Sequence, residues 1–263
     1  MSPRPAGLLF DLDGVIYNAD EPIDGAAETL AWVRRQAIPH LFVTNTTSKP
    51  ALELQRKLER FGIPAEAGQV WTPLAATRQW LSERPEGKAA LFLREAARAD
   101  LAGLPVVDDD AETGADFVVI GDLGSAWDFA RLNRAFRLLH SNPEATLIAL
   151  GRTRYWRAPD GISLDVAPFV AALECAIGRE AITLGKPSRT FFEVAAARLG
   201  LAPHELLMIG DDVLADVGGA QAAGLRGALV RTGKFRPEDL EGAVRPDAVI
   251  DSVAELPSLL RER

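Results

Sequence analysis

Short apolar runs alternate with amphipathic stretches along most of the chain, and this alternation predicts strands separated by helices. Residues 7 to 10 (GLLF) are apolar at successive positions, as in a strand that is covered on both faces. Alternation of this type implies right-handed crossovers between parallel strands, so we expect a parallel sheet. The other core strands are predicted at residues 40–45, 181–185, 205–210, 227–231 and 247–251.

Two of the intervening stretches carry helix signals at their ends. Ser48 is expected to cap a helix whose apolar side chains recur at helical spacing until Gly62 ends it. Ser188 and Gly200 are expected to bound a second helix in the same way. Both helices follow predicted strands, as the crossovers of a parallel sheet require.

The middle of the chain repeats the pattern after a linker at residues 82–88 that is rich in Pro, Gly and charge. It predicts further strands around the segments ALFLR, DFVVIGD and ATLIALG and a helix over residues 127–139. One large sheet would also explain this series. We favour an α/β chain with a doubly wound, Rossmann-like core formed by residues 1–82 and 180–263, and an inserted smaller α/β cap domain at 83–179.

Composition narrows the class of protein. The chain has 263 residues, of which 48% are hydrophobic and 25% charged, as in a soluble globular protein. Its net charge of -8 argues against nucleic acid or an anionic membrane surface as a partner. Cys175 is the single cysteine, which excludes an intramolecular disulfide and favours a reducing, cytoplasmic location.

Polar side chains follow the predicted core strands where each strand ends, which is the edge at which open parallel sheets place their ligands. Carboxylates, a hydroxyl, an amide and one lysine would therefore meet in one crevice. Hard oxygen ligands suit Mg²⁺, and the lysine and hydroxyl suit phosphoryl oxygens. The residues concerned are Asp11, Asp13, Thr44, Asn45, Lys186, Asp211, Asp212 and Asp216.

Each of these positions has an ordinary alternative when taken alone. Thr44 could bond to its own turn, Lys186 could be a solvated surface lysine, and Asp216 could be an exposed helix acid. The joint appearance of all of them, each after an apolar run, is much harder to explain in that way. We therefore expect a magnesium and phosphate site at this edge of the sheet.

The sequence resembles the haloacid dehalogenase superfamily of phosphohydrolases in four motifs. FDLDG matches its first motif, LFVTN its second, GKPS its third and GDDVLAD its fourth, so the resemblance spans residues 8 to 216. The wording around these motifs is similar to the subgroup (IIA) that carries a large α/β cap. GDDVLADVGGAQ and VRTGKFRP are similar to the phospholysine phosphohistidine inorganic pyrophosphate phosphatase branch.

The resemblance implies a role for each motif residue. Asp11 would be the nucleophile that forms an aspartyl-phosphate, and Asp13 the general acid and base. Thr44, Asn45 and Lys186 would bind the phosphoryl group. Mg²⁺ would be held by the Asp11 and Asp211 carboxylates and the Asp13 backbone carbonyl. Asp216 would orient metal-bound waters or the lysine, and the role of Asp212 stays open.

We expect a Mg²⁺-dependent phosphatase that acts on a small phosphorylated metabolite. A haloacid dehalogenase-type hydrolase of carbon–halide bonds and a phosphorylation-sensing, receiver-like module are the alternatives. A homodimer is a compatible assembly, and neither nucleic acid nor a membrane is an expected partner.

Two further segments carry polar and aromatic side chains that could serve function. Arg152, Arg154 and Tyr155 in the cap segment GRTRYWRAPDG are as readily explained by substrate contact as by a solvated cap strand. The Gly-Lys of RTGKF is not a phosphate-cradling loop, because the GxxxxGK[ST] spacing is absent.

Overall fold

A computed structural model describes residues 4–47, 49–158 and 161–261 of the chain. Contacts divide this part into two units. The first unit contains the described residues up to Thr44, then Ala51–Trp71, and those from Lys186 onward; the second contains Asn45–Pro50 and Thr72–Gly185. The α/β class expected from the sequence is confirmed, with strands and helices alternating through both units.

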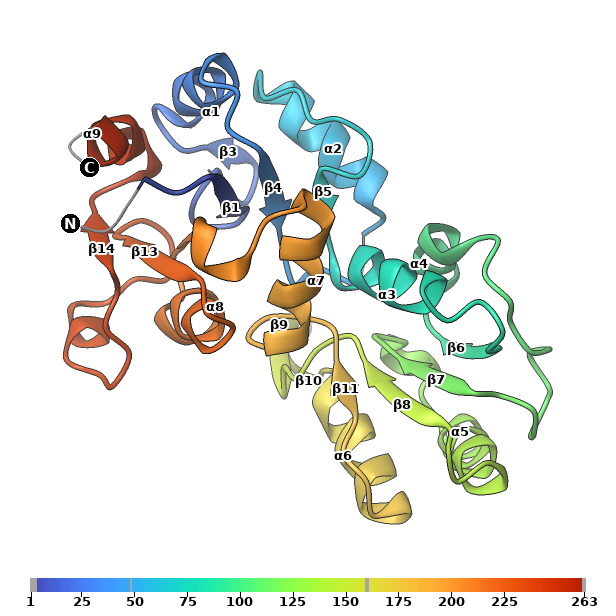
Figure 1. Cartoon of the computed structure of the whole chain (residues 1–263). Coiled ribbons are helices and arrows are strands. Elements are labelled where there is room, and N and C mark those ends of the chain that lie inside the picture. Colours follow the sequence, from blue (N-terminus) through green and yellow to red (C-terminus); the bar gives the residue numbers. More distant parts are fainter. Residues whose placement is uncertain (1–3, 48, 159–160, 262–263) are drawn as a thin grey trace. The chain divides into compact units, whose positions relative to one another are not determined.

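The first unit is built on a six-stranded parallel sheet with the order β14-β13-β12-β1-β4-β5. Figure 1 shows that this sheet takes strands from both ends of the chain, coloured blue and orange to red. The chain adds strands on one side of β1 and later on the other, so the order reverses between β1 and β12, as in doubly wound folds. The strands are β1 Gly7–Asp11, β4 His40–Val43, β5 Val70–Trp71, β12 Leu206–Gly210, β13 Arg226–Val230 and β14 Ala248–Ile250.

Helices cover this sheet because its strands are apolar on both faces. All five residues of β1 are buried, and Leu8 and Phe10 share one hydrophobic cluster with Leu30 of α1, Leu58 of α2 and Leu256 of α9. Further contacts join α7 to α8 and α8 to β13. The helices are α1 Ala26–Arg35, α2 Ala51–Arg60, α7 Arg189–Leu199, α8 Gly219–Ala222 and α9 Leu256–Arg261, and a short hairpin is formed by β2 Tyr17–Asn18 and β3 Glu21–Pro22.

The predicted helix ends are met in part. Gly200 ends α7 in the left-handed region, with φ 67°. Ser188 occupies the N-cap position of α7, as expected, although its side chain makes no capping hydrogen bond. Ser48, the other predicted cap, lies outside the described residues.

The second unit has its own parallel sheet of four strands, in the order β11-β8-β7-β6, and its own hydrophobic cluster. A separate antiparallel hairpin is formed by β9 and β10. The strands are β6 Ala89–Phe92, β7 Phe117–Ile120, β8 Thr146–Ala149, β9 Tyr155–Ala158, β10 Gly161–Leu164 and β11 Ile182–Thr183. The helices are α3 Pro73–Ser82, α4 Glu95–Arg98, α5 Phe129–Ser141 and α6 Val166–Ile177.

Two expectations about the insertion need correction. The run at 181–185 was expected as a core strand, but β11 pairs with β8 in the sheet of the second unit. The second unit also includes Asn45–Pro50, its main stretch begins at Thr72 instead of residue 83, and it ends at Gly185 instead of 179. Its α3 packs within this unit, since Trp80 makes an edge contact with Phe117 at 5.5 Å between ring centroids. An apolar run shows that a strand is buried, but it does not tell which sheet the strand joins.

No helix within the described ranges is long and apolar enough to cross a membrane.

Candidate active site

Three neighbouring strands of the first unit end in polar residues at one edge of the sheet. β12, β1 and β4 lie side by side in parallel, so their carboxyl ends lie at the same edge. Asp11 is the last residue of β1, Thr44 follows β4, and Asp211 follows β12. All three side chains are buried. The topology therefore brings together residues that are far apart in the sequence, next to the point where the strand order reverses.

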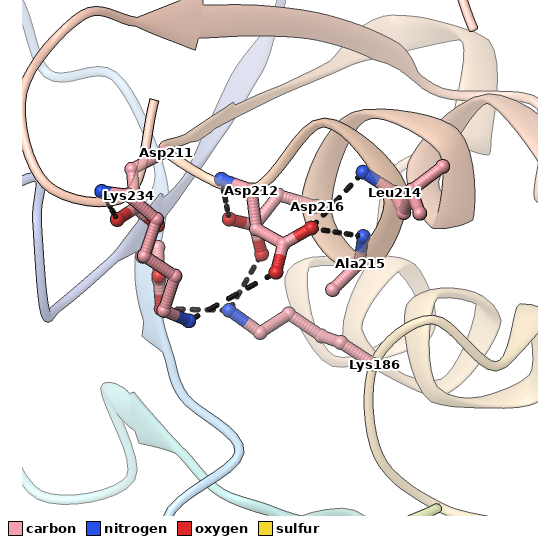
Figure 2. Close-up of polar contacts among 8 residues, drawn as sticks. Lys186, Asp211, Asp212, Leu214, Ala215, Asp216 and Lys234 are labelled. Carbon is pink, nitrogen blue, oxygen red and sulfur yellow. Dashed lines mark hydrogen bonds and ion pairs between the residues drawn. The ribbon is translucent and has the colours of Figure 1, made fainter. Parts of the chain in front are cut away.

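Lys186 lies within hydrogen-bond distance of two of the acids in this site. Its Nζ donates to Asp11 Oδ1 at 2.6 Å and forms an ion pair with Asp216 Oδ1 at 2.7 Å. The side chain of Lys186 is only 4% exposed, so the two pairs are shielded from solvent. Figure 2 shows Lys186 reaching Asp216 across the site. Lys186 therefore holds the nucleophile candidate in place and compensates part of its charge.

A turn of π-helix after β12 positions Asp216. The turn covers Val213–Gly218, and Asp212 caps it by accepting hydrogen bonds from Leu214 N and Ala215 N at 3.0 and 2.9 Å (Figure 2). π-turns are rare and occur often at functional sites. Asp212 is thus accounted for as a capping residue, and Asp216 is a buried member of the charged cluster.

Glycines leave room for Asp211. A Cβ at Gly14 or at Gly233 would lie 2.1 Å from Asp211 Oδ2, and both glycines have positive φ. The same Oδ2 accepts a hydrogen bond from the backbone N–H of Lys234 at 2.8 Å. Side chains at these two positions would displace the carboxylate, so the glycines are part of the site's construction.

Burial shifts the ionisation of the cluster. It raises the pKa of Asp11 against the opposing attraction of Lys186, and it raises the pKa of Asp211 mainly against the hydrogen bond from the Lys234 N–H. It also raises the pKa of Asp216 to about 6, again opposed by Lys186. Burial by itself would lower the pKa of Lys186, but Asp11 and Asp216 outweigh it and raise that pKa above its ordinary value. Three buried carboxylates thus face one lysine, and a further cation would let all of them ionise.

The same carboxylates suit a divalent cation. One oxygen each from Asp11, Asp211 and Asp216 lie within 4.8 Å of one another. Asp211 Oδ1 is buried and has no hydrogen-bond partner among the described residues, although buried carboxylate oxygens are normally paired. Hard oxygen donors with excess negative charge are what Mg²⁺ prefers. The residues present therefore fit a magnesium ion.

Asp13 differs from Asp11 in its surroundings, although the two are separated by one residue. Asp13 is exposed, whereas Asp11 is buried. The backbone of Asp13 forms an isolated β-bridge with Tyr17, at the start of the β2–β3 hairpin. The pKa of Tyr17 is raised by burial and by the negative charges of Asp13 and Asp11, so both carboxylates lie near its ring. An exposed carboxyl beside a buried one suits a group that exchanges protons with solvent.

Thr44 and Asn45 fall in different units despite being adjacent. The Thr44 N–H donates to Trp71 O at 3.1 Å within the first unit. Asn45 groups with the second unit, where its side-chain oxygen lies 3.3 Å from a Cβ built on Gly185. The chain passes from one unit to the other here, and it does so again after Pro50, after Trp71 and after Gly185.

The candidates in the second unit separate into two kinds. Arg152 donates to both carboxylate oxygens of Glu174, at 2.8 and 2.5 Å, and to Thr183 Oγ1 at 3.0 Å. Arg154 and Tyr155 instead lie on the surface at the start of β9, with the guanidinium over the aromatic ring at 5.8 Å. Arg152 therefore has a structural role within its unit, whereas Arg154 and Tyr155 face solvent.

The loop at 231–236, which contains RTGKF, reaches the site, although it was not among the residues expected there. Thr232 Oγ1 donates to Gly14 O at 2.5 Å, and Lys234 N–H donates to Asp211 Oδ2. The signal that could have indicated it is position: the loop follows β13, whose carboxyl end lies at the same sheet edge. The absence of the GxxxxGK[ST] spacing excludes a phosphate-cradling loop, but it does not exclude a loop that contacts the site through its backbone.

Comparisons with known families match both ends of the chain. Residues 8–104 match the haloacid dehalogenase-like hydrolase family, and residues 183–256 match a second family of HAD-like hydrolases. Asp11, Lys186 and Asp211 all lie within these matched ranges.

Curated relatives and solved structures extend the similarity over nearly the whole chain. The phospholysine phosphohistidine inorganic pyrophosphate phosphatase of Rattus norvegicus is 39% identical over 97% of this chain and 93% of its own. The human haloacid dehalogenase-like hydrolase domain-containing protein 2 is 38% identical over 89% of this chain and 87% of its own. The p-nitrophenyl phosphatase from Archaeoglobus fulgidus has a TM-score of 0.86 at 27% identity, covering 98% of this chain and 100% of that one.

Proposed function

This chain belongs to the haloacid dehalogenase-like hydrolases and is a phosphatase of that family, and we propose that it is a Mg²⁺-dependent enzyme that cleaves small phosphorylated molecules through an aspartyl-phosphate at Asp11. One observation carries the proposal: the buried Asp11 carboxylate lies in an ion pair with Lys186 and within 4.8 Å of Asp211 and Asp216. A nucleophile, a cation and metal-binding oxygens are what in-line phosphoryl transfer needs.

Asp11 and Asp211 would hold the metal through their carboxylates and Asp13 through its backbone carbonyl. When bound, Mg²⁺ neutralises charge on the phosphoryl oxygens and lets the buried carboxylates ionise. Asp216 lies against Lys186, so it acts on the lysine in this proposal. Thr44, Asn45 and Lys186 would donate to the phosphoryl oxygens.

The first half-reaction transfers the phosphoryl group to the enzyme. An oxygen of Asp11 forms a bond to phosphorus while the bond from phosphorus to the leaving atom breaks. The leaving atom keeps the electron pair of that bond and takes a proton from the Asp13 carboxyl group. The products of this step are the free leaving group and an aspartyl-phosphate.

The second half-reaction restores the enzyme. Asp13, now ionised, removes a proton from a water molecule, and the water oxygen attacks phosphorus. The bond between phosphorus and the Asp11 oxygen breaks, and its electron pair returns to the carboxylate. Orthophosphate leaves, Asp13 is protonated again, and one water has been consumed for each bond cleaved.

The names of the relatives suggest a substrate class. The rat relative is named for phospholysine, phosphohistidine and pyrophosphate, which have P–N or P–O–P bonds. We extend this chemistry to the present chain, whose 39% identity with that relative runs over 97% of its length. Small molecules with a nitrogen or phosphate leaving group are then the proposed preferred substrates.

The second unit would act as the cap that selects among such substrates. Its exposed Arg154 and Tyr155 offer a cation and an aromatic ring, while Arg152 is engaged with Glu174. The single cysteine favours a reducing compartment, so we place the enzyme in the cytoplasm.

Neither alternative function is favoured. A dehalogenase forms an ester at carbon and needs neither a metal nor Asp13. A receiver-like module would be about half as long by ordinary domain size, whereas the similarity to phosphatases covers nearly the whole chain.

A substrate and metal panel tests the proposal. We expect release of orthophosphate from p-nitrophenyl phosphate, pyrophosphate and phosphohistidine with Mg²⁺, and loss of activity in EDTA. Mg²⁺ at about 100 times its Kd should also stabilise the fold by about 2.7 kcal/mol, seen as a higher Tm. Asp211→Asn should abolish this shift. Full activity in EDTA would contradict the metal requirement.

A further inference from the structure

Lys234 is the second lysine beside the acidic cluster, and its loop is tied closely to the site. The loop donates two hydrogen bonds, from Thr232 Oγ1 to Gly14 O and from Lys234 N–H to Asp211 Oδ2. Gly233 has φ +69° and would place a Cβ 2.1 Å from Asp211 Oδ2. The start of the Lys234 side chain is thus fixed next to a proposed metal ligand.

The two lysines of the site differ in their freedom to meet a substrate. Lys186 is 4% exposed and pairs with Asp11 and Asp216. Lys234 is 68% exposed, and its Nζ lies 3.9 Å from Asp212 Oδ2, beyond hydrogen-bond distance (Figure 2). A loose, exposed ion pair of this kind contributes little to stability, so Nζ can turn to a group of the substrate at small cost.

Asp212 does not depend on Lys234 for its hydrogen bonds. Its Oδ1 already accepts the two capping hydrogen bonds from Leu214 N and Ala215 N. Asp212 would remain satisfied as a helix cap if Lys234 moved away from it. The pairing with Asp212 therefore keeps the Lys234 ammonium near the site and leaves it able to bind another anionic group.

We propose that Lys234 is a specificity-determining residue, whose ammonium pairs with an anionic group on the leaving half of the substrate and so favours phosphoanhydrides over simple esters. The inference rests on the proposed phosphatase function. A substrate with a second phosphate brings added negative charge to a cluster of buried carboxylates in a chain of net charge -8, and an exposed cation there offsets the repulsion. A lysine ammonium recognises phosphate as a compact point charge.

Pyrophosphate shows what this contact would do. Phosphorus moves to the Asp11 oxygen as the bond between phosphorus and the bridging oxygen breaks. The bridging oxygen keeps the electron pair, takes the proton of Asp13 and departs as part of orthophosphate. Lys234 changes no bond in this step, and it binds the departing phosphate and stabilises the charge that develops on it.

The test compares two substrates that differ in the leaving group. For wild type, Lys234→Gln, Lys234→Arg and the control Arg236→Gln, kcat/KM is measured for pyrophosphate and for p-nitrophenyl phosphate with saturating Mg²⁺. Arg236 is an exposed cation two residues away in the same loop. We expect Lys234→Gln to lower the ratio of pyrophosphate to p-nitrophenyl phosphate kcat/KM by about 10- to 100-fold. Lys234→Arg, which keeps the charge, should restore most of the ratio, and Arg236→Gln should leave it as in wild type.

Other outcomes overturn the inference and remain distinct from a failure of the proposed function. An unchanged ratio in Lys234→Gln, or an equal loss on both substrates, removes Lys234 as a specificity residue. Wild-type enzyme that cleaves p-nitrophenyl phosphate but not pyrophosphate also overturns it while leaving the phosphatase in place. Only a wild-type enzyme that cleaves neither substrate counts against the proposed function as well.

Discussion

Asp11, Lys186 and Asp216 form a buried chain of charges in which the lysine lies between two carboxylates, at 2.6 and 2.7 Å. Charges of this kind are costly to bury unless they are paired, and one lysine cannot compensate every acid of the cluster. Asp211 adds a further carboxylate whose Oδ1 lacks a partner among the residues described. At the scale of single residues, the cluster therefore fits a further cation, as the proposed function requires.

Asp13 is the residue whose role can be isolated most easily. It is exposed and lies outside the carboxylate cluster, so its removal should disturb the fold little. We expect Asp13→Ala to lower kcat for p-nitrophenyl phosphate by about 10²- to 10⁴-fold, the usual contribution of a positioned acid or base.

The matched control for this prediction is Asp24→Ala, which also removes an exposed carboxylate from the first unit. Its kcat should remain close to that of wild type. An Asp13→Ala enzyme with wild-type kcat would exclude Asp13 as the general acid and base.

At the scale of elements, the site depends on backbone geometry that the sequence only partly reveals. The ends of β1, β4 and β12 were predictable, because each apolar run stops at a polar residue. The π-turn at Val213–Gly218 was not, since its hydrogen-bond pattern leaves no periodic signal in so few residues. The loop after β13 was missed for a similar reason: its contribution is a backbone N–H, which every residue except proline carries.

Gly233 tests whether this loop matters to the site. Ala at Gly233 and Ala at Gly62 would face the same unfavourable positive φ, at a cost of about 1–2 kcal/mol. Only at Gly233 would the new Cβ meet Asp211 Oδ2, since nothing lies within 4 Å at Gly62. A displacement of about 1 Å can cost about 100-fold in rate, and we expect a loss of that order in kcat for Gly233→Ala.

Gly62→Ala should lose stability in urea unfolding and keep its kcat. Equal effects of the two substitutions on kcat would show that the loop's contact with Asp211 has no catalytic consequence.

Strand β4 also contains His40, a histidine whose hydrogen bonds favour the neutral ring. His40 Nδ1 lies 3.0 Å from Ile38 O, and Gln69 Nε2 lies 2.9 Å from His40 Nε2. Gln69 Oε1 accepts from Glu66 N–H, which fixes the orientation of its amide. The amide therefore presents an N–H₂ donor to Nε2, and a doubly protonated ring would face that donor with another N–H.

The free energy of unfolding should therefore fall in acid. Burial lowers the pKa of His40 from 6.5, and this effect outweighs the opposing hydrogen bond to Ile38 O and the smaller, mutually opposite effects of Arg34 and Glu66. Below about pH 6.5 the unfolded chain binds a proton that the folded chain does not, so this contribution is present above that pH and is lost as the pH falls. Urea unfolding should show a steeper loss on acidification for wild type than for His40→Leu, and parallel curves would contradict this.

At the scale of the whole molecule, the two units divide the proposed work. The first unit contains Asp11, Thr44, Lys186 and the other acids, and the second has its own sheet and hydrophobic core. The existence of an insertion could be predicted, because the strand-plus-charge pattern stops and returns. Its borders could not, since α3 and β11 join the second unit through contacts that local patterns do not encode.

The proposed role of the second unit predicts a change in selectivity. Arg154→Ala and Tyr155→Ala should alter relative kcat/KM values across a panel of phosphorylated substrates by about 10-fold, the effect of one lost contact. Arg152→Ala is the control, because Arg152 pairs with Glu174 and should affect the stability of the unit instead. Identical relative kcat/KM values in wild type and both surface variants would refute a role for this hairpin in selection.

The proposed mechanism requires Asp11 to be the nucleophile that accepts the phosphoryl group. The most direct measurement is to quench the enzyme with acid during turnover of p-nitrophenyl phosphate and to locate the covalent adduct by mass spectrometry of its peptides. We predict one added phosphoryl group on Asp11, and neither adduct nor turnover in Asp11→Asn. A phosphoryl group on another residue, or an Asp11→Asn enzyme that still turns over at a substantial rate, would contradict the account.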